Sequence, residues 1–265
     1  MNTFKDAKRI VIKVGTSTLT HATGQLNIRR VEALVKVLSD LSNSGKELVL
    51  VTSGAISLGC GKAGHTQKPK DTPTKQAMAA IGQCELMYFY DRVFSRYNKT
   101  IAQVLLTKDV VDEEVRLRNV TNTFSRLLEL GVIPIVNEND TVAVDELEGE
   151  FFGDNDNLSA VVAKIIHADV LVLVSDIDGL YTGDPREDKN ATLISVVEEI
   201  TEDIFISATG TGSNRGTGGM FTKIQAAKTA TQAGVHMSIV SGDNPNILYD
   251  LFDGISVGTH FVAKK

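Results

Sequence analysis

Residues Arg9–Ser17 read Arg-Ile-Val-Ile-Lys-Val-Gly-Thr-Ser. The apolar run in this stretch is nearly continuous rather than alternating, which is typical of a strand that is buried on both faces of a parallel sheet. Five more segments have the same character. The six predicted strands are Arg9–Val14, Glu47–Thr52, Thr100–Leu106, Val132–Asn137, Val170–Ser175 and Val235–Val240.

Segments with helical periodicity lie between these strands, and several end at a glycine, which is the expected helix stop. The predicted helices cover Val31–Leu41, Thr74–Tyr97, Leu117–Leu128, Leu158–Ile166 and Thr222–Ala233. Alternating strands and helices predict an α/β fold, a three-layer αβα sandwich with a mainly parallel central sheet. The least regular segments are predicted loops or small hairpins: Gly59–Pro73, Val142–Phe152, with a β-hairpin at Val144–Phe152, and Ile204–Gly219.

Composition excludes several classes of protein. Of the 265 residues, 42% are hydrophobic and 23% are charged, which is ordinary for a globular chain and unlike a disordered or fibrous one. The net charge of −6 argues against nucleic acid or an anionic membrane as a partner, because both require a basic face. Cys60 and Cys84 are too few for a disulfide framework, and no apolar run approaches the roughly 20 residues that span a bilayer. We therefore expect a cytoplasmic protein.

Polar residues follow the end of every predicted strand. In open α/β sheets, ligands bind outside the carboxyl ends of the strands, so these residues favour one shared polar site along that edge. For any single strand end, an ordinary turn explains the residues equally well. The segments are Lys13–Ser17, Thr52–Gly54, Thr107–Asp109, Asn137–Asp140, Ser175–Asp176 and Ser241–Asp243.

Lys13 interrupts the first predicted strand. A buried, unpaired ammonium group costs several kcal/mol, so this side chain must either reach solvent at an edge of the sheet or meet anions.

The segment Gly210–Lys223 contains five glycines before a predicted helix. Backbone N–H groups of such a loop can approach phosphate oxygens, and the helix N-terminus with Lys223 adds positive charge. The alternative is a surface loop without a ligand. The segment is not a P-loop, because no GxxxxGK[ST] motif occurs in the chain.

Residues Gly153–Asn157 read Gly-Asp-Asn-Asp-Asn and precede the helix predicted at Leu158. Asp156 or Asn157 can cap this helix, and capping alone is one interpretation. Two carboxylates and two amides exceed what one cap requires, which favours a role in holding lysines, magnesium or an amino group.

Two other patterns do not predict a site. Gly59–Gly64 matches GxGxxG, but it does not directly follow a strand and His65–Pro73 cannot open a helix, so dinucleotide binding is not expected. The five histidines show no metal-ligand spacing with the cysteines, which argues against a zinc site.

Seven stretches in order resemble the amino-acid kinase family and, within it, the glutamate 5-kinase group. They are Val11–Ser17, Val51–Ile56, Pro134–Asp140, Gly153–Ala160, Gly179–Pro185, Gly216–Met220 with Lys223, and Gly254–Thr259. The Asn-Glu-Asn-Asp and Gly-Asp-Asn-Asp-Asn blocks are the ones that look specific to that group. The resemblance implies a single amino-acid kinase domain over residues 1–265, without the C-terminal PUA domain that many bacterial relatives carry.

The resemblance also implies an activity, namely ATP-dependent phosphorylation of the side-chain carboxylate of L-glutamate to L-glutamyl 5-phosphate, the first step of proline biosynthesis. It assigns catalysis to Lys13, Lys223 and Asp156, and glutamate binding to Ser53, Asp140 and Asn155. The ATP-binding residues that it implies are Lys13, Ser175, Asp176, Thr217, Gly218, Gly219, Met220, Phe221, Thr222 and Lys223. It further implies Mg²⁺ held mainly through ATP, proline as a feedback inhibitor, and a homo-oligomer.

Two other functions stay open at this point. A sister kinase would phosphorylate acetylglutamate, aspartate, carbamate or a nucleoside monophosphate. Acetylglutamate has no free amine to pair with Asp140, and a monophosphate would require arginines, which the Ser53, Asp140 and Asn155 blocks lack. A non-catalytic sensor is the second possibility, although it has no need for both lysines and Asp156.

Overall fold

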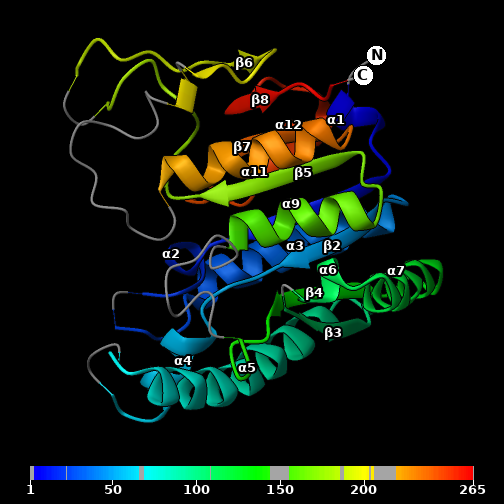
Figure 1. Cartoon of the computed structure of the whole chain (residues 1–265), viewed down its shortest axis with the longest axis vertical. Coiled ribbons are helices and arrows are strands. Elements are labelled where there is room, and N and C mark those ends of the chain that lie inside the picture. The colour runs from blue at the N-terminus through cyan, green and yellow to red at the C-terminus, as the bar shows by residue number, and fades with distance from the viewer. Residues whose placement is uncertain are drawn as a thin grey trace.

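The computed structural model describes residues 3–21, 23–65, 69–107, 109–143, 155–185, 188–202, 204–205 and 219–264. Its centre is an eight-stranded sheet in the order β3-β4-β2-β1-β5-β7-β8-β6 (Figure 1). Neighbouring strands pair in parallel, except that β8 runs antiparallel to β7. The strands are β1 (Arg9–Val14), β2 (Glu47–Val51), β3 (Ile101–Leu106), β4 (Ile133–Glu138), β5 (Val170–Ser175), β6 (Val196–Val197), β7 (His236–Ser241) and β8 (Thr259–Phe261).

The six predicted strands are confirmed, and their ends differ from the prediction by at most one residue. The edge strand β6 and its neighbour β8 were not predicted. They contain two and three residues, which is too short for a periodic pattern to be visible in the sequence.

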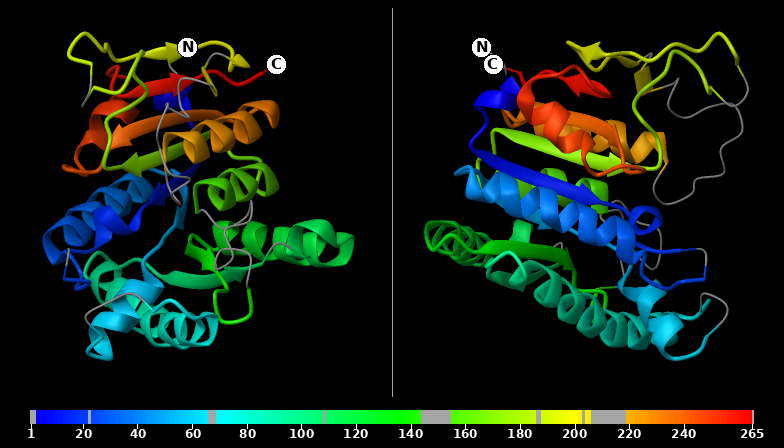
Figure 2. Two further views of the ribbon diagram at one scale, coloured as in Figure 1. Left: turned by 60° about the vertical axis from the view of Figure 1, so that its left-hand side comes forward. Right: turned by 180° about the vertical axis from the view of Figure 1, so that it is seen from behind.

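Helices cover both faces of the sheet, so the predicted three-layer αβα sandwich with a mainly parallel sheet is confirmed. One apolar core lies between the sheet and α1, α3, α5 and α12, and the other lies beneath α7, α9 and α11. Figure 1 shows α9 and α11 in front of the sheet, and the view from behind in Figure 2 shows α3 and α12. The helices are α1 (Thr3–Asp6), α2 (Thr16–Leu19), α3 (Ile28–Asn43), α4 (Ala55–Lys62), α5 (Thr72–Ser95), α6 (Asp109–Asp112), α7 (Glu114–Glu129), α9 (Asn155–Ile165), α11 (Met220–Gln232) and α12 (Ile247–Asp253).

The strand β1 shows why the apolar run in the sequence is continuous. Ile10, Ile12 and Val14 point into the first core, whereas Val11 points into the second. A strand that is covered on both faces has no solvent-facing positions along its middle, and therefore no alternation of polar and apolar residues.

The prediction of a loop over Gly59–Pro73 is wrong for its first residues, because Gly59–Lys62 belong to α4 and α5 begins at Thr72. Two glycines explain the helix pair. A Cβ atom on Gly59 would lie 1.9 Å from the carbonyl oxygen of Met78, and one on Gly82 would lie 1.7 Å from that of Ala55. Gly59, the first glycine of the GxGxxG pattern, is thus a site of close packing between α4 and α5.

Other predicted segments differ at their ends or fall outside the described residues. The helix α5 begins two residues before its predicted start because Asp71 caps it, accepting a hydrogen bond from the Thr74 N–H at 2.9 Å. The predicted hairpin at Val144–Phe152 and most of the Ile204–Gly219 segment lie outside the described residues. In the part of the chain that the structure describes, none of the helices combines the length and the apolar character needed to cross a bilayer.

Candidate active site

The strand ends bring most of the predicted site residues to one edge of the sheet. The strand β1 lies between β2 and β5. The chain adds β2, β3 and β4 on one side of β1 and then crosses to add β5 and β7 on the other side. A crevice forms at the carboxyl end of such a switch point in the strand order. Lys13 comes from β1, Ser53 follows β2, and the first turns of α9 and α11 bring Asp156 and Lys223 to the same place.

Asp156 lies between the two lysines. Its Oδ1 is 2.6 Å from the Lys13 Nζ, and its Oδ2 is 3.0 Å from the Lys223 Nζ. The Thr222 hydroxyl donates to the same Oδ2 at 3.3 Å. Lys13 is 7% exposed, Lys223 4% and Asp156 0%. We call Lys13, Asp156 and Lys223 the lysine cluster.

The charges in the lysine cluster keep Asp156 ionised. Burial alone would raise the pKa of this carboxyl group, but the positive charges of Lys13 and Lys223 outweigh burial and hold the pKa below its usual range. Two ammonium groups thus contact one carboxylate in a buried position. Such a position attracts an anion, and a phosphate group is the anion that the neighbouring glycine-rich segment predicts.

A second group of side chains lies beside the lysine cluster and consists of neutral amides. The Asn155 Nδ2 lies 2.8 Å from the Thr52 carbonyl oxygen, 2.8 Å from the Ser53 Oγ and 3.1 Å from the Asn137 Oδ1. The Asn137 Nδ2 in turn donates to the Gln83 Oε1 at 2.9 Å. All of these side chains are buried. We call Gln83, Asn137 and Asn155 the amide cluster.

The start of α9 joins the two clusters, because Asn155 and Asp156 are its first two residues. The interpretation that Asp156 or Asn157 caps this helix is wrong. A cap residue precedes the first helical residue, whereas both of these lie inside the first turn, and the carboxylate of Asp156 contacts the lysines instead.

The remaining predicted residues lie around the same edge. Asp140 is buried two residues beyond the end of β4. Ser175 ends β5, and its hydroxyl donates to the Asp176 Oδ1 at 3.0 Å. Gly219 precedes α11, and Met220, Phe221 and Thr222 form its first turn together with Lys223. Thr217 and Gly218 lie outside the described residues.

Sequence reasoning missed two members of the amide cluster. Asn137 stands in a polar strand end that the prediction did include, but only Asp140 of that segment was selected. Gln83 lies in the middle of a helix, where its signal is a single polar residue in the buried stripe of Ala79, Leu86 and Tyr90. A buried polar side chain in an apolar stripe needs a hydrogen-bond partner, and this requirement is the signal that could have found it.

The described residues contain no group of three or more His, Cys, Asp or Glu side chains arranged to hold a metal ion. Asp156, the carboxylate of the lysine cluster, has both of its oxygens beside ammonium groups. A metal ion at Asp156 would therefore have to compete with two ammonium groups for the carboxylate oxygens.

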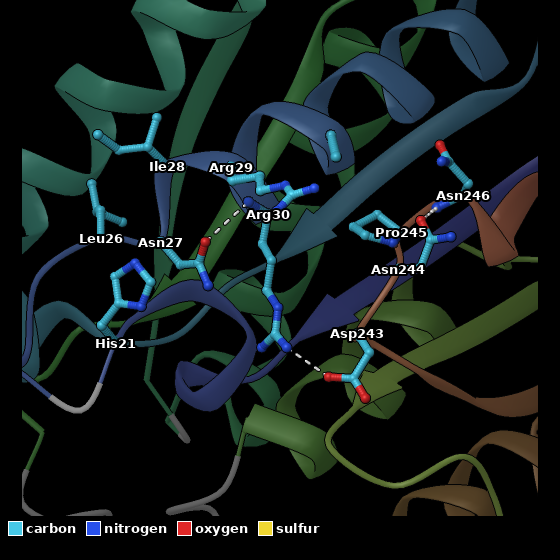
Figure 3. A pocket seen from close by; sticks show the side chains of 11 residues that line it. His21, Leu26, Asn27, Ile28, Arg29, Arg30, Asp243, Asn244, Pro245 and Asn246 are labelled. Atoms are coloured by element: carbon cyan, nitrogen blue, oxygen red, sulfur yellow. Dashed lines mark hydrogen bonds and ion pairs between the residues drawn. The ribbon is translucent and has the colours of Figure 1, made fainter.

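A separate pocket of about 830 Å³ lies at the start of α3 (Figure 3). The Arg30 guanidinium reaches the Asp243 carboxylate after β7 at 2.6 Å, and the Asn27 side chain accepts the Arg30 N–H at 3.2 Å. Its described lining includes Asp243 of the polar segment after β7, but none of the residues to which the family resemblance assigns catalysis or binding. We therefore place the candidate active site at the lysine and amide clusters rather than in this pocket.

Comparisons with known proteins show the family to which the chain belongs. The model of the amino acid kinase family matches residues 8–241. The chain is 53% identical to a glutamate 5-kinase of Clostridium perfringens, covering 98% of this chain and 97% of that protein, and 54% identical to one of Clostridium tetani with the same coverage. The crystal structure of a UMP kinase from Bacillus anthracis has the same fold, with a TM-score of 0.64 at 19% identity over 98% of this chain and 97% of that one. The chain therefore belongs to the amino acid kinase family, in its glutamate 5-kinase branch.

Proposed function

We propose that this chain transfers the γ-phosphoryl group of ATP to the side-chain carboxylate of L-glutamate and forms L-glutamyl 5-phosphate, the first step of proline biosynthesis. The observation that carries the proposal is the buried lysine cluster, in which two ammonium groups contact one carboxylate, placed directly beside the amide cluster. One cluster suits the reacting phosphoryl group, and the other suits a small polar acceptor.

The chemistry needs no general base, because a carboxylate is already a nucleophile at neutral pH. An oxygen of the glutamate side chain forms a bond to the γ-phosphorus, while the bond from that phosphorus to the β,γ-bridging oxygen breaks and ADP leaves. Catalysis then consists of holding two anions in line and neutralising the charge that spreads over the transferred group. Lys13 and Lys223 flank that group, and Asp156 aligns the two ammonium groups.

Glutamate and ATP bind to different groups of residues. Ser53, Asp140 and Asn155 bind glutamate, with the Asp140 carboxylate facing its α-ammonium group. Ser175, Asp176 and the segment Thr217–Lys223 bind ATP. Ser175 and Asp176 stand at the end of β5, and the segment Thr217–Lys223 continues into the first turn of α11, where the helix dipole favours phosphate. Mg²⁺ bound to the ATP phosphates supplies further charge neutralisation.

Finer features of the enzyme are part of the same proposal. Proline inhibits by competing with glutamate, because both ligands carry an α-carboxylate and an α-amino nitrogen. The protein acts in the cytoplasm as a homo-oligomer, and each subunit consists of one kinase domain. Inhibition titrations at several glutamate concentrations and sedimentation analysis test these points separately.

The decisive experiment measures ADP release with ATP, Mg²⁺ and a panel of acceptors. We expect turnover with L-glutamate and trapping of the acyl phosphate by hydroxylamine. Equal or faster turnover with acetylglutamate, aspartate or UMP would assign the chain to a different kinase reaction. ADP release with none of the acceptors would favour the sensor.

A further inference from the structure

Gln83 is a buried residue of α5 whose side chain meets Asn137 at the end of β4. Its Oε1 accepts a hydrogen bond from the Asn137 Nδ2 at 2.9 Å. Asn137 is also hydrogen-bonded to Asn155, because its Oδ1 accepts from the Asn155 Nδ2 at 3.1 Å. Three amides from three different elements thus form a chain that ends at the first residue of α9.

The direction of this amide chain is fixed by the backbone. The Thr52 carbonyl oxygen can only accept a hydrogen bond, and it lies 2.8 Å from one branch of the Asn155 amide, so that branch must be the NH₂ group. Asn137 must then present its oxygen to Asn155 and its NH₂ group to Gln83. The orientation of each amide follows from the hydrogen-bond network and does not depend on distinguishing nitrogen from oxygen.

This orientation leaves two open ends, the Nε2 of Gln83 and the carbonyl oxygen of Asn155, and only the second lies at the start of α9, beside the lysine cluster. Among the described residues, the Asn155 Oδ1 is buried and has no hydrogen-bond partner. An unpartnered buried acceptor carries a desolvation cost that a ligand donor removes. An ammonium group can donate to this oxygen, whereas a carboxylate would be repelled by it.

We infer that Gln83 is a positioning residue, which acts through Asn137 to hold the Asn155 oxygen toward the α-ammonium group of the amino-acid substrate. The inference rests on the proposed function and deepens it, because it assigns part of the selectivity for a free amino acid to a residue that does not contact the substrate. Without Gln83, the Asn137 NH₂ group loses its acceptor, and Asn137 can turn away from Asn155.

The helix α5 is well placed for this role. Tyr90, seven residues after Gln83 and therefore on the same face, has its hydroxyl 2.9 Å from the Thr52 Oγ1. The backbone contact of Gly82 with Ala55 holds α5 against α4. One rigid helix thus supports both the β2 end that orients Asn155 and the β4 end that carries Asn137.

The test compares Gln83→Met with the parent and with Gln76→Met, a matched substitution seven residues earlier on α5. For Gln83→Met we expect the KM for glutamate to rise about 5-fold, the effect of one neutral hydrogen bond. The KM for ATP and kcat should stay within about twofold of the parent, a range well below that single-bond effect. Glutarate, which has both carboxylates but no ammonium group, should inhibit parent and variant with the same Ki. Gln76→Met should leave all of these constants unchanged.

The outcomes distinguish a failure of the inference about Gln83 from a failure of the proposed function. An unchanged glutamate KM in Gln83→Met, or an equal rise of the glutarate Ki, would overturn the inference while the proposed function stands. A parent that does not phosphorylate glutamate would overturn both. If Gln83→Met does not fold, Gln83→Asn provides the same test, since the shorter amide keeps the polarity but does not reach Asn137.

Discussion

The two clusters of the candidate active site are neighbours and are equally buried, yet they are held together by different interactions. The lysine cluster consists of three full charges and has no neutral member. The amide cluster consists of neutral groups whose orientation is fixed by a backbone carbonyl. A charged network suits a place where charge develops during a reaction, and a neutral one suits a place where a substrate must bind and leave.

This difference has a measurable consequence. Removing one partner from a buried charge network leaves an uncompensated charge, whereas breaking a neutral hydrogen bond costs about 1 kcal/mol. Substitutions in the lysine cluster should therefore change kcat or stability, and substitutions in or near the amide cluster should change the KM for glutamate.

The largest effect is expected for Asp156→Asn. Without the carboxylate, two buried ammonium groups face each other, and the free energy of unfolding should fall by about 3–5 kcal/mol at neutral pH. The kcat should fall as well, because the ammonium groups lose the anion that aligns them. Urea unfolding followed by circular dichroism measures the first effect, and an unchanged midpoint would show that Asp156 does not hold the lysines together.

The pH dependence of stability tests the role of the Asp156 carboxyl group independently. Because the pKa of Asp156 is lowered in the folded state, its stabilising contribution is complete above the unfolded pKa of about 3.9 and is lost as the pH falls through the lower folded value. The difference in unfolding free energy between the parent and Asp156→Asn should therefore shrink at acidic pH. A difference that stays constant from neutral pH down to pH 3 contradicts this assignment.

Lys13→Met and Lys223→Met should lower kcat on the order of 10²–10³-fold, with small changes in the KM of either substrate. Unlike Asp156→Asn, each leaves one ammonium group paired with one carboxylate, so both variants should fold. Lys36→Met, on the exposed face of α3, is the control. If all three variants keep the parental kcat, the two lysines serve structure alone.

Asp140→Ala should weaken glutamate binding rather than slow phosphoryl transfer. Loss of a charge-assisted contact of about 1.5–3 kcal/mol corresponds to a rise in the glutamate KM of roughly 10- to 150-fold. The KM for ATP should stay close to the parental value. Initial-rate measurements with each substrate varied in turn make this distinction, and an equal rise in both constants would place Asp140 outside the glutamate site.

Ser53→Ala is the smallest change that we predict. The Ser53 Oγ is one of three acceptors around the two hydrogens of the Asn155 NH₂ group, so its loss still leaves an acceptor for each hydrogen. The glutamate KM should therefore rise only about 2- to 10-fold, the range of one neutral hydrogen bond. A loss of kcat as large as that of the lysine variants would mean that the two clusters do not divide the work in this way.

The sequence predicts the regular part of this molecule well and the contacts between its parts less well. Strands such as Arg9–Val14 were found because burial on both faces leaves a continuous apolar run. Lys13, Asp156 and Lys223 stand out in the sequence because each interrupts or begins an element at the carboxyl edge of the sheet, and the structure brings them together, while their catalytic roles come from the family resemblance. Gln83 was not found, because its partner Asn137 lies 54 residues away and only the packing of α5 brings them together. The two glycines of the α4–α5 contact were missed for the same reason.

The consecutive placement of Asn155 and Asp156 has a consequence for redesign of the acceptor site. Successive residues of an α-helix point about 100° apart around its axis, so the first turn of α9 sends one side chain to each cluster. The other members of the amide cluster come from β4 and α5, which supply no residue to the lysine cluster. New acceptor preferences can therefore be built from those two elements while the phosphoryl-transfer residues stay in place, provided that position 155 keeps a side chain that the backbone after β2 can orient.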